Sequence, residues 1–201
     1  MRILALDLST TCTGVALFDT ETHPQLIQTY KLKSSTLGTS KMCKLEKTLV
    51  KMERLAEQIL ALIEELSPDQ LVIEEIAGSR SRLTQKTLDG FHWILYAKLA
   101  SRWLPRVDLY DVTGSAGWRT DLRLKLSEAD KAANKEAKVL NRRLGRGQQI
   151  AIIGPKHLSC RYANAKYGLA LNVDQDSTDG DIADAVSLGD AWIKFKFTKS
   201  K

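Results

Sequence analysis

The sequence has few of the residues that build disulfide frameworks or zinc sites. Its three cysteines, Cys12, Cys43 and Cys160, are scattered and include no C-x-x-C pair, and its three histidines have no ligand spacing. An odd number of isolated cysteines is typical of a reducing, intracellular setting. We therefore expect neither a disulfide framework nor a zinc centre.

Long apolar runs are also missing. No stretch approaches the roughly 18 apolar residues of a membrane span, and the N-terminus lacks the basic start and long apolar middle of a signal peptide. We therefore expect a soluble, cytoplasmic protein without a membrane partner. With 201 residues, 43% of them hydrophobic, the chain has the size of one domain around one core.

Charge is distributed unevenly along the chain. The formal net charge is +6, and residues 119–148 alone hold nine basic and four acidic side chains. Residues 174–190 hold six aspartates and no basic residue. A basic surface favours a polyanionic partner, whereas the acidic run by itself is compatible with a solvated loop.

The spacing of apolar residues predicts an α/β fold. Strand-like runs lie at 2–7, 14–19, 25–33, 71–76 and 107–112, and helical periodicity lies at 41–66, 79–104, 127–144, 156–167 and 181–194. Short connections favour antiparallel pairing of the first three strands, and helical crossovers imply parallel pairing of the later ones. We predict a mixed five-stranded sheet flanked by helices, in a single domain over residues 1–201 with a basic insertion at about 113–155.

Four acidic residues interrupt or end apolar segments. Asp7 ends the first strand and Glu74 interrupts the fourth, while Asp181 and Asp184 lie three residues apart at the start of the last helix. Asp7, Glu74 and Asp181 have ordinary explanations as a turn residue, a surface residue and a residue at a helix N-terminus, respectively. Capping does not explain Asp184, which lies in the apolar part of its helix, and a carboxylate there is costly unless it is paired, hydrogen-bonded or metal-bound.

A meeting of the four carboxylates would require positive charge. No basic residue is among their immediate sequence neighbours, and their mutual repulsion amounts to several kcal/mol at an effective dielectric of about 20. Oxygen-only ligands favour Mg²⁺ or Mn²⁺ over zinc. Two such ions roughly 4 Å apart activate water and stabilise the leaving oxygen in phosphodiester cleavage. A basic surface around an acidic centre suits that substrate.

The order of the motifs "LALDLSTTCTGVAL", "LVIEEI" and "DIADAVSLGDAW" resembles the RuvC-type Holliday-junction resolvases of the RNase H-like, retroviral-integrase superfamily. The closing D-x-x-D-A is the most specific part, and the resemblance extends from residue 1 to about 194 except for 113–155. The small size and the basic insertion are similar to the phage-encoded branch. The family pattern, apolar-apolar-Ile-Glu, favours Glu74 over Glu75. The resemblance implies a catalytic tetrad that holds two Mg²⁺ ions, with Mn²⁺ as a substitute: Asp7, Glu74, Asp181 and Asp184.

The resemblance also implies a homodimer whose two sites nick opposing strands of a four-way junction, leaving 5′-phosphate and 3′-hydroxyl ends. It places the helix after Glu74 against DNA, and the basic insertion is a second candidate surface. The expected DNA-binding residues are Arg80, Arg82, Lys86, Arg119, Arg123, Lys125, Lys131 and Lys135. Trp118 is a weaker candidate for stacking on bases. Ala77 replaces an aromatic residue of cellular relatives, which favours a broader selectivity for junctions, forks and flaps.

Three alternatives stay open. An RNase H-type nuclease would keep the metal chemistry and cut RNA–DNA hybrids, and a non-catalytic branched-DNA-binding protein would keep the fold alone, although all four tetrad positions are acidic here. An actin-like or sugar-kinase ATPase would use "LDLSTTCTG" as a phosphate-binding hairpin. Ser9 occupies the glycine position of that motif, and such kinases need two duplicated domains, normally over twice this length.

Overall fold

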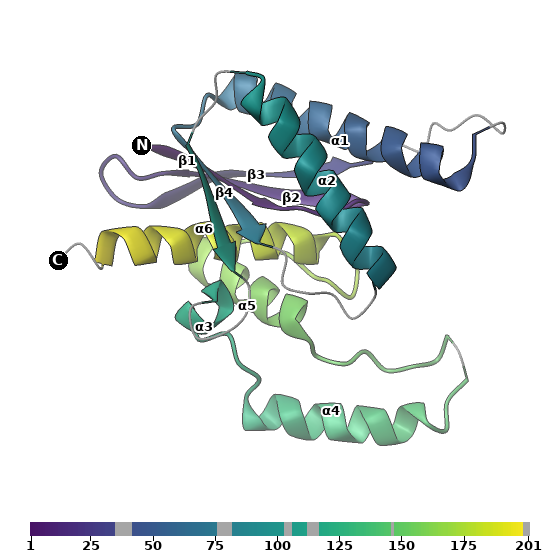
Figure 1. Cartoon of the computed structure of the whole chain (residues 1–201). Coiled ribbons are helices and arrows are strands. Elements are labelled where there is room, and N and C mark those ends of the chain that lie inside the picture. The colour runs from purple at the N-terminus through teal and green to yellow at the C-terminus, as the bar shows by residue number, and fades with distance from the viewer. Residues whose placement is uncertain (35–41, 76–81, 103–105, 112–116, 146, 199–201) are drawn as a thin grey trace.

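The computed structural model of the chain has a central sheet with helices on both faces (Figure 1). It describes residues 1–34, 42–75, 82–102, 106–111, 117–145 and 147–198. The strands are β1 (Arg2–Asp7), β2 (Cys12–Asp19), β3 (Gln25–Lys33), β4 (Gln70–Glu75) and β5 (Arg106–Asp111). The helices are α1 (Lys44–Leu66), α2 (Arg82–Ala100), α3 (Trp118–Asp121), α4 (Glu128–Asn141), α5 (Pro155–Tyr167) and α6 (Asp179–Thr198).

The sheet is mixed, with the strand order β3-β2-β1-β4-β5. β1 and β3 both pair antiparallel with β2, and β4 pairs parallel with both β1 and β5. Short turns join the antiparallel strands, whereas α1 and α2 are the crossovers that parallel pairing requires. The predicted mixed sheet of three antiparallel strands followed by parallel strands is confirmed.

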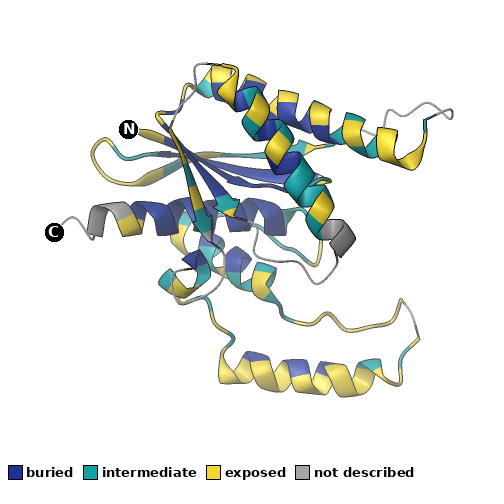
Figure 2. Cartoon of the chain, viewed as in Figure 1, coloured by how far each residue is buried: buried dark blue, intermediate teal, exposed yellow. Residues whose placement is uncertain are grey.

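Alternation along β1 divides the buried side chains between two cores. Ile3 and Ala5 pack in the core that contains the buried residues of α6, together with residues of α3 and α5. Leu4 and Leu6 pack on the opposite face against α1 and α2. Figure 2 shows both buried layers meeting the sheet. Because Asp7 continues the odd-numbered series, its side chain lies on the α6 face.

Helix α6 lies very close to the sheet. A Cβ atom built on Gly189 would lie 2.3 Å from Cε2 of Phe18, and one built on Gly14 would lie 2.0 Å from the carbonyl oxygen of Asp181. Residues 180–193 of this helix are all buried (Figure 2). Gly14 also pairs with Asp7 in the β1–β2 register. The close approach therefore brings the first turn of α6 to the end of β1.

Most helix boundaries differ from the sequence prediction by one to a few residues. Helix α1 begins at Lys44 rather than at 41, and the carboxylate of Glu46 accepts a 2.7 Å hydrogen bond from the backbone N–H of Cys43 there. Helix α3 was not predicted, because four residues are too few to establish a helical period. Among the described helices, none combines the length and the apolar character needed to cross a membrane.

Helix α4 and the chain that returns along it, residues 147–153, lie to one side of the sheet and are called the α4 arm here (Figure 1). The side-chain amide of Asn134 donates to the carbonyl of Ile153 and accepts from its N–H, both at 2.8 Å. Asn141, about two turns further along α4, makes the same pair of bonds with Ile150 at 2.9 and 2.7 Å. The two asparagines thereby fix an extended segment antiparallel to the helix.

Candidate functional site

The four acidic residues singled out in the sequence lie at one end of β1, β4 and α6. Parallel pairing places Leu6 beside Ile73, so the next residues, Asp7 and Glu74, lie side by side on the α6 face. Their carboxyl groups are joined by a hydrogen bond. Asp181 and Asp184 lie in the first two turns of α6, where a spacing of three residues keeps them on one helical face.

Three of these carboxylates are nearly inaccessible. The exposed fractions of Asp7, Asp181 and Asp184 are 9%, 6% and 3%. Glu74 is half-buried, whereas its neighbour Glu75 is exposed. Burying so many carboxylates in one place is unfavourable unless cations or hydrogen-bond donors accompany them.

The acid–base properties of the site reflect this crowding. Burial raises the pKa of Asp7 well above its usual value, and the charges of Glu74 and Asp184 raise it further, against the opposing charge of Lys156. Burial also raises the pKa of Glu74, although its hydrogen bond with Asp7 and the charge of Arg119 act in the opposite direction. The raised pKa values of these neighbouring carboxyl groups mean that the site holds too little positive charge to stabilise all of them in the ionised form.

Two cations reach the site from distant parts of the sequence. Lys156, in the first turn of α5, forms an ion pair with Asp181. Arg119, in α3, pairs with Asp184 at 2.8 Å between Nη2 and Oδ2. The hydroxyl of Ser159 donates a further bond to Asp184 at 2.5 Å. The sequence neighbours of the four acidic residues contain no basic residue, and both cations come from distant positions, because α3 and α5 supply them through tertiary packing.

Trp118 and Arg119 form one packed unit against α6. The guanidinium of Arg119 lies 4.4 Å from the ring centroid of Trp118. Trp118 is fully buried, so the expectation that it stacks on bases is wrong. Within the described part of the chain, the Nε atom of Arg119 is buried and has no hydrogen-bond partner.

The chemistry of the site suits a hard divalent ion, although its present arrangement does not enclose one. Within the described residues, no group of three or more His, Cys, Asp and Glu side chains is arranged to hold a metal. Asp181 and Asp184 are engaged by Lys156 and Arg119 instead. Four carboxyl groups with surplus negative charge are nevertheless the donor set that Mg²⁺ or Mn²⁺ prefers, so the residues fit such ions in donor type and charge.

Comparison with solved structures identifies the architecture. The Thermus thermophilus RuvC structure matches with a TM-score of 0.57 and 12% identity, covering 99% of this chain and 97% of that chain. The chain has the RuvC-type fold. T. thermophilus RuvC in complex with Holliday junction substrate gives a TM-score of 0.55 at 12% identity, with 99% and 96% covered. The yeast mitochondrial Holliday junction resolvase Ydc2 gives 0.51 at 15% identity, with 96% and 77% covered. No protein-family model and no curated protein sequence matches the chain.

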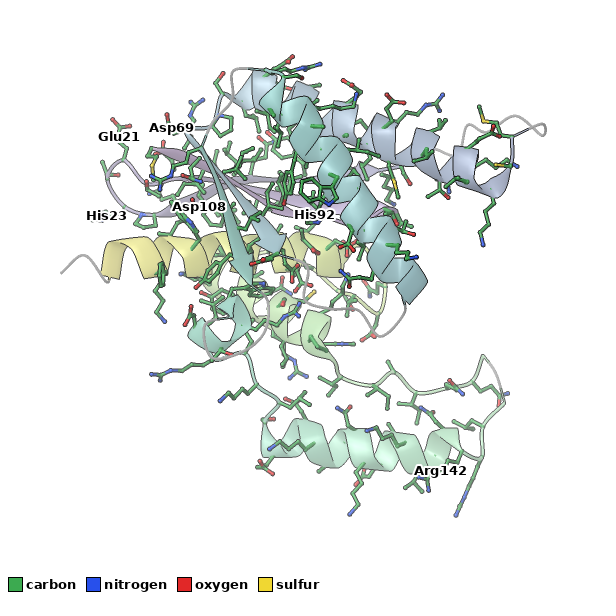
Figure 3. All side chains as sticks on the ribbon, viewed as in Figure 1. Glu21, His23, Asp69, His92, Asp108 and Arg142 are labelled. Carbon is green, nitrogen blue, oxygen red and sulfur yellow. The ribbon has the colours of Figure 1, made fainter. Side chains whose placement is uncertain are left out.

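On this RuvC-type fold, the predicted DNA-binding residues occupy several separate surfaces. Lys86 is exposed on α2, and four more exposed basic residues follow α3 or lie on α4: Arg123, Lys125, Lys131 and Lys135. Arg80 lies outside the described residues, and only the backbone of Arg82 is described. Arg119 differs from the rest because it is directed at Asp184. Figure 3 shows Arg142 at the far end of α4, away from the sheet.

Two features around the site were not anticipated from the sequence. Lys156 had no periodic or motif signal, and its side chain lies across Gly180, where a Cβ atom would meet its Cδ at 2.5 Å. The thiol of Cys12 adjoins Asp181. Burial, followed by the charge of Asp181, raises the pKa of Cys12 to about 11. The cysteine is therefore a neutral member of the site's lining rather than a nucleophile.

Proposed function

We propose that the protein is a divalent-metal-dependent endonuclease that resolves four-way DNA junctions and also cuts other branched DNA. One observation carries the proposal: in a RuvC-type fold, Asp7 and Glu74 lie side by side at the ends of β1 and β4, and the charge of Asp184, near the start of α6, acts on both. Asp7, Glu74, Asp181 and Asp184 would hold two Mg²⁺ ions, with Mn²⁺ as a substitute.

The metal ligands and the residues around them would have separate roles in the reaction. Bound metal would supply an activated water nucleophile and charge stabilisation for the departing 3′-oxygen, giving 5′-phosphate and 3′-hydroxyl ends. Ser159 orients Asp184 through its hydroxyl. Arg119 and Lys156 supply positive charge beside the carboxyl groups, where a phosphodiester would otherwise be repelled.

Branched DNA fits the distribution of basic side chains. Exposed basic residues on α2, after α3 and along the α4 arm point to contacts with more than one DNA arm, and phosphate contacts of this kind dominate affinity for nucleic acid. We propose that Arg80 and Arg82 also contact DNA. The solved T. thermophilus complex contains a Holliday junction substrate, which makes a four-way junction the first substrate to test.

A homodimer with two sites would nick opposing strands. The side chain of Trp93, on α2, is 72% exposed, and we propose that it belongs to the interface between the two copies. We further propose that residues 1–201 act as one nuclease domain in which 113–155 is a DNA-facing insertion. Action in the cytoplasm and a phage origin stay predictions.

The decisive experiment compares branched, duplex and RNA–DNA hybrid substrates with Mg²⁺, Mn²⁺ or a chelator, and maps the product ends. Asp7→Asn and Asp184→Asn should each lower junction cleavage by at least about 10²-fold and leave junction binding intact, because repulsion of phosphate falls. Glu21→Gln, in the exposed β2–β3 turn (Figure 3), removes the same charge far from the site and serves as the control.

Two alternative functions have their own outcomes in this experiment, and thermal melting with and without a nucleotide tests the ATPase. Cleavage restricted to hybrids would favour an RNase H-type enzyme, and junction binding without metal-dependent cleavage would favour a non-catalytic binder. Stabilisation by a nucleotide would favour the ATPase. Full cleavage by the two Asp→Asn variants would refute the assignment of the catalytic residues.

A further inference from the structure

The two cations of the site occupy the carboxylates that a metal would need. Lys156 and Arg119 pair with Asp181 and Asp184, respectively. Both aspartates are at least 90% buried, so solvent offers them little alternative stabilisation. The ion pairs are therefore the main source of positive charge for the α6 half of the site.

Lys156 is held in place by the shape of α6. Its side chain runs across Gly180, and the absence of a side chain there leaves room for the lysine Cβ, Cγ and Cδ atoms. A lysine side chain is ordinarily protonated at neutral pH, and the ammonium group of Lys156 contacts the carboxylate of Asp181.

Arg119 is held in place by a different element. Helix α3 presents its guanidinium between the ring of Trp118 and Asp184, and the side chain is only 23% exposed. An arginine stays charged in any such environment. Its Nε atom is buried without a hydrogen-bond partner among the described residues, so the side chain still has an unused donor at the site.

We propose that Arg119 and Lys156 are internal counter-ions that occupy the acidic site before metal binds and thereby lower its affinity for divalent ions. The proposal rests on the proposed function insofar as the four carboxyl groups bind metal. Each cation would compete with a metal ion for the negative charge of one aspartate carboxylate, so binding of one weakens binding of the other. By thermodynamic linkage, removing a counter-ion should strengthen metal binding by the factor by which that counter-ion weakened it.

The test is equilibrium binding of Mn²⁺ to the full-length chain without DNA, measured by isothermal titration calorimetry. Arg119→Gln and Lys156→Gln should each bind Mn²⁺ roughly 5- to 150-fold more tightly than the unmodified chain. Lys98→Gln and Arg102→Gln are matched controls, because they remove the same charge from ion pairs with Glu57 and Glu64 between α1 and α2. The controls should stay within about threefold of the unmodified chain, since exposed distant charges are screened.

A charge-neutral variant tests the same idea independently. Gly180→Ala should push the Lys156 side chain off Asp181, because the new Cβ would lie 2.5 Å from its Cδ. It should therefore tighten Mn²⁺ binding in the same direction as Lys156→Gln without altering net charge. If Arg119→Gln does not fold, Lys156→Gln and Gly180→Ala decide the outcome.

Unchanged or weaker Mn²⁺ binding in the site variants, relative to the controls, would overturn the counter-ion proposal alone, provided that Asp7→Asn abolishes binding. If neither the unmodified chain nor the site variants bind Mn²⁺, or if Asp7→Asn binds it as well as the unmodified chain does, the metal-dependent function fails and the counter-ion proposal fails with it. Junction cleavage is not the readout, so the two failures stay distinguishable.

Discussion

Replacing Gly14 by alanine should distort the candidate site from a position that carries no chemistry. Gly14 lies in β2, and a Cβ atom there would lie 2.0 Å from the carbonyl oxygen and 2.2 Å from the carbonyl carbon of Asp181. Real Cβ contacts essentially never fall below 3.0 Å. The obstruction is backbone, so no side-chain rotation can relieve it. Helix α6 must therefore move away from β2 by about 1 Å, which is the gap between these two distances.

Two consequences of that displacement can be estimated. Overpacking of this kind costs about 1–3 kcal/mol, and a chain of this size loses about 2–4 °C in Tm per kcal/mol, so Tm should fall by roughly 2–12 °C. Asp181 and Asp184 move with the helix. A misplacement of about 1 Å in a catalytic group lowers turnover by about 10²-fold, so junction cleavage should decline even where the protein remains folded.

The assay combines thermal unfolding with initial rates of junction cleavage at a temperature well below Tm. Gly90→Ala is the matched control, because a Cβ atom at this position in α2 would meet nothing within 4 Å. Alanine inside a helix should stabilise by about 0.5–1 kcal/mol relative to glycine, so this variant should melt slightly higher and cleave normally. A Gly14→Ala protein with normal Tm and normal cleavage would show that α6 does not approach β2 as described.

Three further predictions concern buried titratable groups. Asp190→Asn should lower the free energy of unfolding in urea by about 1–3 kcal/mol, because Asp190 accepts from Tyr167 at 2.7 Å and pairs with Lys166 at 2.6 Å; an unchanged value would refute this anchoring role. Burial lowers the pKa of His92 to about 4, so the unfolded chain binds a proton first and stability should fall by up to about 3 kcal/mol from pH 6.5 to 4; His92→Leu should flatten that part of the unfolding profile. The bonds of Asp130 with Arg161 and Ser127 lower the pKa of Asp130 to about 2, so this contribution is complete above about pH 4 and is lost as the pH falls towards 2. The protection of α4 amides against exchange, relative to their intrinsic rate at each pH, should fall over that range, and Asp130→Asn should show low protection even at pH 5.

The sheet was predictable because its evidence is local. Short continuous apolar runs identify β1 and β2, the long apolar stripe of α1 identifies a helix by its period, and turn lengths then restrict the pairing. Helix α3 lacks such a signal, since it has only four residues. Its burial follows from contacts with α6 rather than from any pattern in its own sequence.

The acidic half of the site was predictable for a related reason. A carboxyl group that interrupts an apolar segment is visible in the sequence, as at Asp7 and Asp184, although whether these residues ligate metal stays a prediction. The cations of the site could not be recognised in the sequence, because the ion-pair partner of Asp184 is 65 positions away, at Arg119. Arg119 was expected to bind DNA like other basic residues nearby, and only the packing of α3 against α6 separates it from them.

The position of α3 also has a consequence for how this protein could be altered. Arg119 and the α4 arm belong to the same stretch of chain, between β5 and α5. A truncation that removes residues 113–155, or a graft that replaces them with a short linker, would delete the guanidinium beside Asp184 together with the exposed basic residues of the α4 arm. The segment is thus not a dispensable module. Any chimera across it must restore an arginine to the site before its loss of activity can be attributed to DNA binding.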